Sequence, residues 1–228
     1  MPKSPTSADP SASATSSDPG TASVAPRSRN RRGHGGQLRD ELIAAATALL
    51  EAGGTEAGVT LRAVTRRAGV APQAFYLQFN DTDELLWAVY AAAFQRFEAA
   101  LSSAETNHNK PDDALRARCE AHCTYAAEHP ASYRLLFGTV GSYKPLWNPD
   151  ELPGTTTFQA WHRTISRCID AGQARNCDPF MLTITLIAAL HGLVILQLNR
   201  PSFPWPPLNQ LVDDVLTNQI GLITPSAG

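Results

Sequence analysis

Apolar residues recur three and four positions apart through most of the chain after residue 36, which is the spacing of helices with one buried face. The first such run starts at Gln37 and ends at Gly53 and Gly54, a pair that stops helices. The pattern predicts further helices at about 60–68, 72–79, 82–106, 111–128, 130–138, 155–172, 178–199 and 207–220. No segment shows the strict alternation of a half-buried strand. The sequence therefore predicts an all-α protein of about nine helices.

Short capping signals divide the region after the first helix. Thr60 is a preferred N-cap residue, and Gly69 is a preferred C-terminal stop. Pro72 stands at the first position of the next helix, where proline is tolerated. Asp81 and Glu84 have the spacing of a capping pair at the start of the following helix. The two short helices with a tight glycine-containing turn between them predict a helix-turn-helix.

The second of these short helices carries three aromatic residues on barely two turns. Phe75 and Phe79 are four positions apart, so they share one face and can pack against the preceding helix. In a helix-turn-helix the opposite face enters the major groove of DNA. The residues predicted to point away from the core are Ala71, Pro72, Gln73, Tyr76 and Leu77.

This predicted outer face is mostly apolar. Gln73 is its one side chain suited to a bidentate contact, preferentially with adenine, and the apolar residues can contact thymine methyl groups. The face therefore favours half-sites that contain A·T pairs. An ordinary helical hairpin in a globular core would show the same pattern of apolar residues, so other features have to decide between the two interpretations.

The distribution of charge favours DNA binding. The chain has 228 residues, 43% of them hydrophobic, and a formal net charge of -2. Residues 27–79 nevertheless contain eight Arg against four acidic residues, so this segment is basic and the rest of the chain is acidic. A basic end on an acidic body indicates a polyanionic partner bound at that end.

Residues 1–35 are predicted to form a disordered tail, because they are rich in Ser, Pro and Ala and offer little to bury. The tail ends in a basic arm of the kind that enters a minor groove, with a solvated tail of no specific role as the alternative. No apolar secretory signal is visible at the start, and the four Cys residues are expected to be reduced, which predicts a cytoplasmic protein. The arginines of the arm are Arg27, Arg29, Arg31 and Arg32.

From about Gly36 to Arg96 the chain resembles the DNA-binding domain of the TetR (tetracycline-repressor-like) regulators. The resemblance rests on LIAAATALLEAGG, then VTLRAVTRRAGVAPQAFYLQF, then DTDELLWAVY. It implies a homodimer that binds a palindromic operator in double-stranded DNA and is usually released by a small molecule. Carried onto matching positions, it implies phosphate contacts by Thr60 and Tyr76, and base contacts from residues 71–77.

Arg62 is counted with the DNA-binding residues as a part of the basic region. Two positions depart from the family pattern. Thr82 stands where members often have Lys at the start of the fourth helix, and Ala74 stands where they often have a hydroxyl. Both departures remove contacts to the DNA backbone, which dominate affinity, and the arginine arm is expected to compensate for them.

Two later segments, EHPASYRLLFG and AALHGLV, resemble the C-terminal ligand-binding domain of a TetR subgroup named for a Trp-His-Gly motif. Of that motif His191 and Gly192 are present, and Ile187 stands where the Trp is sought. The resemblance divides the chain into a tail with its arm (1–35), a helix-turn-helix domain (36–96) and a helical effector-binding and dimerisation domain (97–228).

The C-terminal domain is expected to hold a small apolar or aromatic effector in a pocket capped by the loop at 138–154. The helices at 155–172 and 178–199 are expected to form the dimer interface, because an obligate interface resembles an apolar core. Most aromatic residues in helices are simply core residues, and His191 is equally suited to a hydrogen-bonded place in the core. The candidate pocket residues are Tyr125, Tyr133, Phe137, Trp147, Trp161 and His191.

Two local features suggest other functions, and both have a simpler interpretation. Phe180 to Leu198 carries no formal charge and is long enough to span a membrane, but polar residues interrupt it and no Lys/Arg cluster flanks it. A buried helix is therefore favoured. Cys119, His122 and Cys123 share one helical turn without an evident fourth ligand, so neither a metal nor another cofactor is expected.

Enzymes are disfavoured because the chain has no G-x-S-x-G, H-E-x-x-H or phosphate-binding glycine loop. A small all-α enzyme would also have no use for a basic arm beside a helix-turn-helix. An activator or architectural DNA-binding protein that needs no effector stays open as the alternative to a repressor, since the sequence does not separate these functions.

Overall fold

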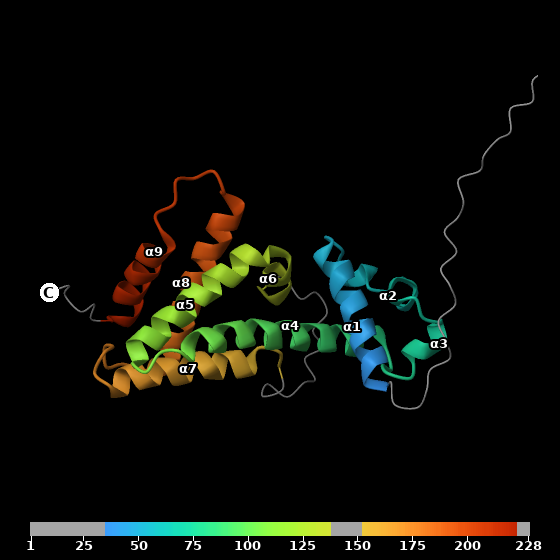
Figure 1. The fold of residues 1–228 in the computed structure, drawn as a ribbon, viewed down its shortest axis with the longest axis horizontal. Helices are drawn as coiled ribbons and strands as arrows, with labels where there is room; N and C mark the ends of the chain where they lie inside the picture. The colour runs from blue at the N-terminus through green and yellow to red at the C-terminus, as the bar shows by residue number, and fades with distance from the viewer. Residues whose placement is uncertain (1–34, 138–151, 223–228) are drawn as a thin grey trace, which may run out of the picture. The chain divides into compact units, whose positions relative to one another are not determined.

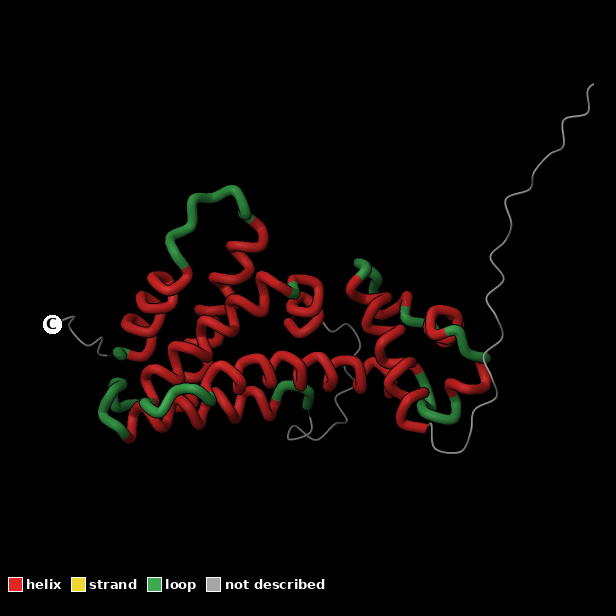
Figure 2. The backbone as a smooth tube through the Cα atoms, viewed as in Figure 1, coloured by secondary structure: helices red, strands yellow, loops and turns green. Residues whose placement is uncertain are grey.

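The computed structural model of the chain describes residues 35–137 and 152–222, and both ranges are helical without strands (Figures 1 and 2). The predicted all-α fold class is confirmed over these residues. Their α-helices are α1 (Gly35–Glu51), α2 (Leu61–Ala68), α3 (Pro72–Phe75), α4 (Thr82–Glu105), α5 (Pro111–Glu128), α6 (Pro130–Phe137), α7 (Thr155–Asp170), α8 (Pro179–Asn199) and α9 (Leu208–Val215). A 3₁₀ turn at Glu56–Gly58 precedes α2. The arginine arm, Trp147 and most of the 138–154 loop lie outside the described residues.

Helices α1 to α3 and the first half of α4 enclose an N-terminal core. Its two buried polar residues, Thr47 and Thr65, satisfy their hydroxyls locally, because each donates to a backbone carbonyl one turn earlier, at 2.8 and 2.9 Å. All the larger buried side chains are apolar, so this core consists of hydrocarbon. They are Leu38, Leu42, Val59, Val64, Phe75, Phe79, Leu85 and Val89.

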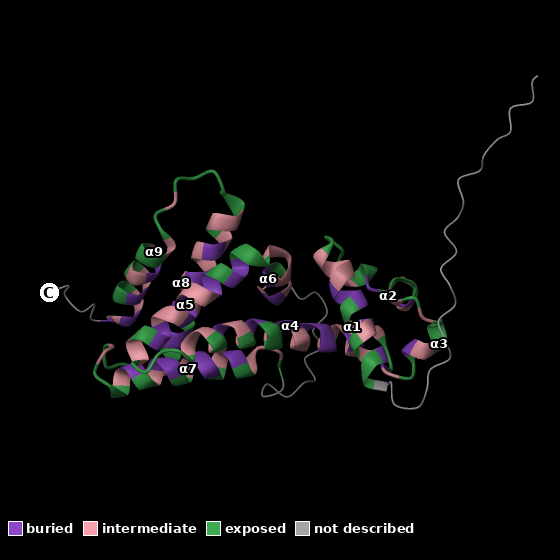
Figure 3. Cartoon of the chain, in the orientation of Figure 1, coloured by how far each residue is buried: buried purple, intermediate pink, exposed green. Residues whose placement is uncertain are grey.

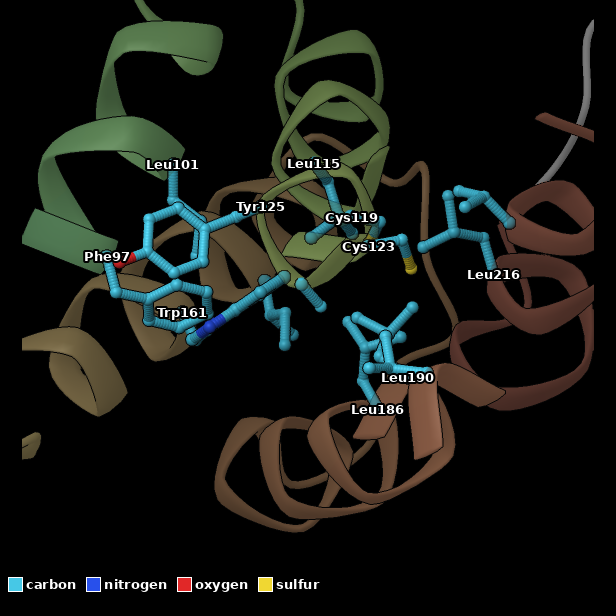
Figure 4. Packing of buried hydrophobic residues seen from close by; sticks show 14 of the residues in the cluster. Phe97, Leu101, Leu115, Cys119, Cys123, Tyr125, Trp161, Leu186, Leu190 and Leu216 are labelled. Carbon is cyan, nitrogen blue, oxygen red and sulfur yellow. The ribbon is translucent and has the colours of Figure 1, made fainter. Parts of the chain in front are cut away.

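The second half of α4 packs with α5, α6, α7, α8 and α9 around a C-terminal core (Figure 4). Buried positions recur along α4, α5 and α7 with exposed positions between them, as expected for helices with one inner face (Figure 3). Unlike the N-terminal core, this one also buries an arginine and a histidine, Arg118 and His122. Its large, fully buried apolar members include Phe97, Leu101, Leu115, Tyr133, Trp161, Ile165, Leu186 and Leu190.

Helices α4 and α6 connect the two cores. Helix α4 contacts α1 near its start and α5, α6 and α7 further along. Leu135 of α6 packs against both hydrophobic clusters. On the same helix, the hydroxyl of Ser132 donates to the carboxylate of Glu51, at the end of α1, over 2.5 Å. Helix α6 therefore touches both the N-terminal core and the C-terminal core.

Helix α3 is shorter than the predicted helix at 72–79. After Phe75 the N–H groups of Leu77 and Gln78 bond to carbonyls three residues back, at 3.3 and 2.9 Å, which is the tighter winding of a turn. The prediction of a helix as far as residue 79 was therefore wrong. The helix ends early because Asp81 must already be extended, with φ -152° and ψ 179°, to cap the start of α4. The predicted helix at 207–220 is likewise divided into α9 and a π-helical turn at Leu216–Ile220.

Candidate DNA-binding surface and effector core

The turn between α2 and α3 is built by backbone hydrogen bonds around one glycine. Gly69 has φ 68° and ψ 31°, in the left-handed region that only glycine adopts without strain. Its N–H bonds to the Arg66 carbonyl at 3.3 Å, and the N–H of Val70 bonds to the Thr65 carbonyl at 3.0 Å. This pair of bonds is the Schellman motif that ends helices. At the other end of α2, the hydroxyl of Thr60 accepts from the Ala63 N–H at 3.2 Å, so both predicted caps are confirmed.

Helix α3 is held from one side and exposed on the other. Phe75 and Phe79 are 0% and 2% exposed, with ring centroids 5.7 Å apart, and they fix α3 onto the N-terminal core. Tyr76 and Leu77 are 66% and 75% exposed. The predicted division of the aromatic residues is confirmed, because two anchor the helix and the third faces outward. The remaining predicted outer residues Ala71, Pro72 and Gln73 are exposed too.

The start of α4 is fixed by a reciprocal cap. The Asp81 carboxylate accepts from the N–H of Glu84 at 2.8 Å, and the Glu84 carboxylate accepts from the N–H and the side-chain amide of Asn80, at 2.8 and 2.9 Å. The predicted capping pair is confirmed. It sets the exit from the helix-turn-helix within one turn of Phe79, so α3 has little freedom to move as a unit.

The exposed surface of α2 carries more positive charge than the candidate residues alone. Arg62 is exposed as expected, and so are Arg66 and Arg67 in the last turn of α2, beside the Gly69 turn. Sequence reasoning counted these two arginines in the basic region but did not name them as contacts. Ala74, where a hydroxyl is common in the family, is half-buried and packs against the N-terminal core.

The C-terminal core contains a group of touching aromatic rings centred on Phe97. Its ring lies 5.1 Å from that of Tyr125, 6.3 Å from that of Tyr133 and 6.0 Å from that of Phe137. His122 lies 5.2 Å from Phe97 on another side. Figure 4 shows Phe97 from α4 beside Trp161 and Tyr125. Edge-on contacts at these distances are favourable for aromatic rings.

Two histidines share one tyrosine in this group. The Tyr133 hydroxyl lies 2.8 Å from Nε2 of His122 and 3.0 Å from Nδ1 of His191. Burial, then the nearby His191 and Arg118, lowers the pKa of His122 to about 3. Burial also lowers the pKa of His191 and raises that of Tyr133. All three side chains are therefore neutral at pH 7, and His191 is a hydrogen-bonded residue at the margin of the core.

A buried arginine, Arg118, packs against Trp161 in the same core. The guanidinium of Arg118 is fully buried, 2.5 Å from the Glu98 carboxylate and 3.4 Å from that of Glu105, and it lies 4.6 Å above the Trp161 ring. The Glu105 carboxylate also accepts from the Thr164 hydroxyl at 2.7 Å. The arginine thus ties α4, α5 and α7 together, and its charge is paired.

Two open pockets flank the aromatic group. One, of about 600 Å³, is lined by Glu51 of α1, Arg96 of α4, Tyr125 of α5 and Ser132 of α6. The other, of about 480 Å³, lies between α4 and the start of α7, where Phe94 lines it. The Phe94 ring is 6.1 Å from that of Phe137, so the second pocket adjoins the aromatic group.

The candidate pocket residues thus fall into three positions. Tyr133, Phe137, Trp161 and His191 belong to the aromatic group, Tyr125 lies between this group and the 600 Å³ pocket, and Trp147 lies outside the described residues. Sequence reasoning missed two members. Phe97 is the centre of the group, and its helical spacing from Ala93 and Leu101 was the available signal. The place of His122 beside two cysteines indicates only metal binding, so no signal in the sequence assigns it to the aromatic group.

The cysteine-histidine cluster behaves as core. Cys119 and Cys123 are buried, and burial raises the pKa of both thiols, that of Cys123 to about 12. Nε2 of His122 is hydrogen-bonded to the hydroxyl of Tyr133. Within residues 35–137 and 152–222, no three His, Cys, Asp or Glu side chains are grouped as metal ligands would be.

Comparison with known proteins agrees with this architecture. The family described as "Bacterial regulatory proteins, tetR family" matches residues 42–89, and the family described as "Tetracyclin repressor-like, C-terminal domain" matches residues 115–219. The chain belongs to the TetR family. It is therefore a DNA-binding transcriptional regulator and not an enzyme.

Solved structures share the fold over most of this TetR-family chain. A protein of unknown function from Rhodococcus sp. RHA1 is 25% identical, with a TM-score of 0.70, and the match covers 86% of this chain and 100% of that one. SmeT, the repressor of the Stenotrophomonas maltophilia multidrug efflux pump SmeDEF, is 22% identical, with a TM-score of 0.62 over 83% and 94% of the two chains. Bacillus subtilis FadR with stearoyl-CoA is 14% identical, with a TM-score of 0.65 over 81% and 99%.

Proposed function

We propose that this TetR-family regulator is a homodimeric repressor that binds a palindromic operator and is released by a small apolar or aromatic effector. The observation that carries the proposal is the α2–α3 pair. Its buried phenylalanines fix a short helix whose outer residues are exposed beside the arginines of α2. A rigid, exposed helix next to positive charge is suited to the major groove.

The proposed DNA contacts divide by chemistry. Thr60, Arg62 and Tyr76 reach phosphates, and Gln73 reads a base edge together with the apolar residues Ala71, Pro72 and Leu77. The exposure of all seven side chains supports this assignment. We add Arg66 and Arg67 as further phosphate contacts, because they are exposed on the same short helix.

The proposed arm contacts come from Arg27, Arg29, Arg31 and Arg32, which precede α1 in the sequence. Deletion of residues 1–32 should weaken binding to every DNA sequence and reduce the dependence of affinity on salt, because fewer counterions are released. An unchanged affinity and an unchanged salt slope would reject a role for the arm.

Helix α8 is the proposed centre of the dimer interface. It is long and apolar enough to cross a membrane, yet only 28% of its apolar stretch is buried within the chain. The exposed side carries Met181, Ile184, Ala188 and Leu196, which recur at helical spacing. In contrast, α7, predicted to share the interface, exposes mainly polar residues such as Gln159, Arg163 and Arg167. A second copy of the chain covers an apolar helix face without any cost in buried charge.

Gly192 supports a close helix crossing at this face. A Cβ at this position would meet no atom within 4 Å, so nothing inside the described chain demands a glycine. Within a helix glycine costs about 1 kcal/mol relative to alanine. Gly192→Ala should therefore stabilise the isolated fold but weaken self-association, which sedimentation equilibrium can measure. Unchanged association would remove Gly192 from the interface.

The C-terminal aromatic group supports an effector site built around Tyr133, Phe137, Trp161 and His191, with Tyr125 and Trp147 as further candidates. Half-buried rings at its margin, above all Phe137 and His191, offer apolar contact and one polar atom. Two neighbours of the same fold have structures in complex with molecules of large apolar content, SmeT with triclosan and FadR with stearoyl-CoA. An apolar effector for this chain is in keeping with both.

Three finer assignments accompany the proposal. The C-terminal domain is assigned to the Trp-His-Gly subgroup on the strength of His191 and Gly192. The chain is divided into a tail and arm (1–35), a DNA-binding domain (36–96) and an effector-binding and dimerisation domain (97–228), in accord with the two separate cores. A cytoplasmic location follows from the DNA partner.

The deciding experiment is selection of bound sequences from random DNA duplexes by the purified full-length protein at moderate salt. A two-fold-symmetric consensus, with half-sites about one helical turn or a multiple apart, is the expected result. Retention without a consensus would reduce the protein to a non-specific binder. No retention at low salt would make the α2–α3 pair a core hairpin and end the proposal.

A further inference from the structure

Three polar side chains lie in a row through the C-terminal core. Nε2 of His122 on α5 is 2.8 Å from the hydroxyl of Tyr133 on α6, and this hydroxyl is 3.0 Å from Nδ1 of His191 on α8. His122 and Tyr133 are fully buried, whereas His191 is half-buried. The row therefore leads from the centre of the core to its margin.

The chemistry of the row permits only two arrangements of protons. A phenol has one proton, so Tyr133 donates to one imidazole and must accept from the other. Both imidazoles are neutral, because burial holds the pKa of each below its usual value, and a neutral ring carries a single N–H. The direction of the row thus fixes which nitrogen of each histidine is protonated.

Nδ1 of His122 decides between the two arrangements. This atom is buried without a hydrogen-bond partner among the described residues. If the row ran toward His122, Nδ1 would carry a buried proton with no acceptor. If the row runs toward His191, Nδ1 is a bare lone pair.

The surroundings of His122 favour the lone pair. Arg118 lies one turn earlier on the same face of α5, and its Nε is also buried without a hydrogen-bond partner within the described residues. A further donor without an acceptor, next to this fixed positive charge, would be more costly than an acceptor there. His122 therefore donates from Nε2 to Tyr133, and Tyr133 donates to Nδ1 of His191.

His191, which is half-buried, consequently bears its proton on Nε2, the ring nitrogen that Tyr133 does not contact. No acceptor for this N–H is present among the described residues, and the Phe137 ring lies beside it, with centroids 5.0 Å apart. We propose that His191 Nε2–H is the hydrogen-bond donor of the effector site, and that the effector is an uncharged apolar molecule with one hydrogen-bond acceptor, such as a carbonyl oxygen. This inference rests on the effector-binding function proposed above.

The charge of the ligand follows from the charges around the row. Arg118 is paired with Glu98 and Glu105, and both histidines are neutral, so the described core offers no unpaired charge at this place. A charged ligand would lose its hydration without a compensating partner. An uncharged ligand with a single acceptor loses little hydration and satisfies the one available donor.

The first test needs no ligand. Full-length protein labelled with ¹⁵N-histidine would be studied by long-range ¹H–¹⁵N correlation at pH 7, with signals assigned through His122→Gln and His191→Gln, and His129→Gln as the exposed control. We expect both rings to carry the proton on Nε2, with Nδ1 bare. A proton on Nδ1 of His191, or an imidazolium there, would overturn the inference.

Tyr133→Phe is the matched variant, because it removes only the hydroxyl that links the two rings. His191 should then lose its single tautomer and show the mixture of an unconstrained imidazole. An unchanged His191 tautomer in this variant would mean that the row does not set the proton position, and the inference would fail.

The second test uses probes that differ only in the acceptor. Acetophenone is compared with ethylbenzene, and benzophenone with diphenylmethane, by titration of the labelled protein. The ketone of each pair should bind about tenfold more tightly and shift the His191 Nε2 signal, and benzoate should not compete. Equal binding within both pairs, or no ketone effect at His191, would overturn the proposed ligand class.

DNA binding without ligand is measured in parallel, so that the effector chemistry and the regulator function are tested separately. Intact operator binding together with the wrong histidine tautomer rejects only the effector chemistry. Loss of specific DNA binding in the unmodified protein rejects the regulator, whatever the histidines show.

Discussion

The two cores of this protein are stabilised in different ways. The N-terminal core is hydrocarbon, and its buried threonines bond to carbonyls within their own helices. The C-terminal core encloses a paired arginine and a histidine-tyrosine-histidine row that joins three helices. The hydrocarbon core stabilises a small DNA-binding region. The second core gives one particular packing of α4 to α8, and it is where we propose that the effector binds.

The largest expected effect lies in the hydrocarbon core. Phe75→Ala removes a fully buried ring and should cost about 3–5 kcal/mol of the stability of the DNA-binding half. Specific DNA binding should be lost, while the C-terminal core, which does not contain Phe75, keeps its near-ultraviolet circular dichroism signal. Thermal unfolding followed by both far- and near-ultraviolet signals would separate the two halves.

The adjacent Tyr76 supplies the control. This residue is 66% exposed, so Tyr76→Ala should change stability by no more than about 0.5 kcal/mol and still weaken DNA binding. Equal destabilisation by the two substitutions would contradict the assignment of one aromatic to the core and the other to the partner.

The next largest effect lies in the polar core. Arg118→Met leaves the carboxylates of Glu98 and Glu105 without their cation and should cost about 3 kcal/mol. The loss is placed at the lower end of the range for buried pairs, because these side chains keep 15% and 19% exposure and water can reach them. Urea unfolding of the full chain measures it.

Adding Glu98→Gln to Arg118→Met should restore part of the lost stability, since it removes the charge closest to the missing guanidinium. The same glutamine in an otherwise unmodified chain should destabilise it. If the double variant is less stable than Arg118→Met alone, the effect of Arg118 is packing against Trp161 and not charge pairing.

The two cores also differ in how far the sequence predicted them. The N-terminal signals are local: Thr60, Gly69 and Asp81 each act on backbone groups within three or four residues, so the caps and the exposed face of α3 could be predicted before any tertiary contact was known. The end of α3 could not, because the competing start of α4 decides where the helix stops.

The polar row escaped prediction for a related reason. His122 and His191 are joined through Tyr133, which lies 11 residues from one and 58 from the other, and no periodic pattern encodes such a contact. The sequence nominated Tyr133 and His191 by residue type and by the family resemblance. His122 stands beside Cys119 and Cys123 in the sequence, which suggests metal binding instead. In the structure His122 and both cysteines are buried in the core.

Protonation of His122 in the unfolded chain should have a smaller effect on stability. The unfolded His122 binds a proton below about pH 6.5, whereas burial holds the pKa of the folded residue at about 3. Between these values the unfolded chain binds more protons, so stability must fall as the pH is lowered, by up to about 1.4 kcal/mol for each pH unit. Urea unfolding at pH 6.5 and pH 5 measures the slope before most carboxylates titrate.

His122→Gln keeps a hydrogen-bonding group for Tyr133 but cannot take up a proton. The slope between pH 6.5 and pH 5 should become clearly shallower in this variant, and His129→Gln, which changes an exposed histidine, should leave it as it was. Parallel slopes in all three proteins would mean that His122 accepts a proton in the folded state.

The smallest effect tests whether one hydroxyl serves both the fold and the DNA. Thr60 caps α2 by accepting from the Ala63 N–H, so Thr60→Ala should cost about 1 kcal/mol and weaken DNA binding as well. Thr60→Ser should keep both properties. Thr60→Asp separates them, since its carboxylate caps the helix at least as well but is repelled by a phosphate. Wild-type stability with weakened DNA binding in the aspartate variant assigns Thr60 to the interface, whereas unchanged DNA affinity there would leave it a cap alone.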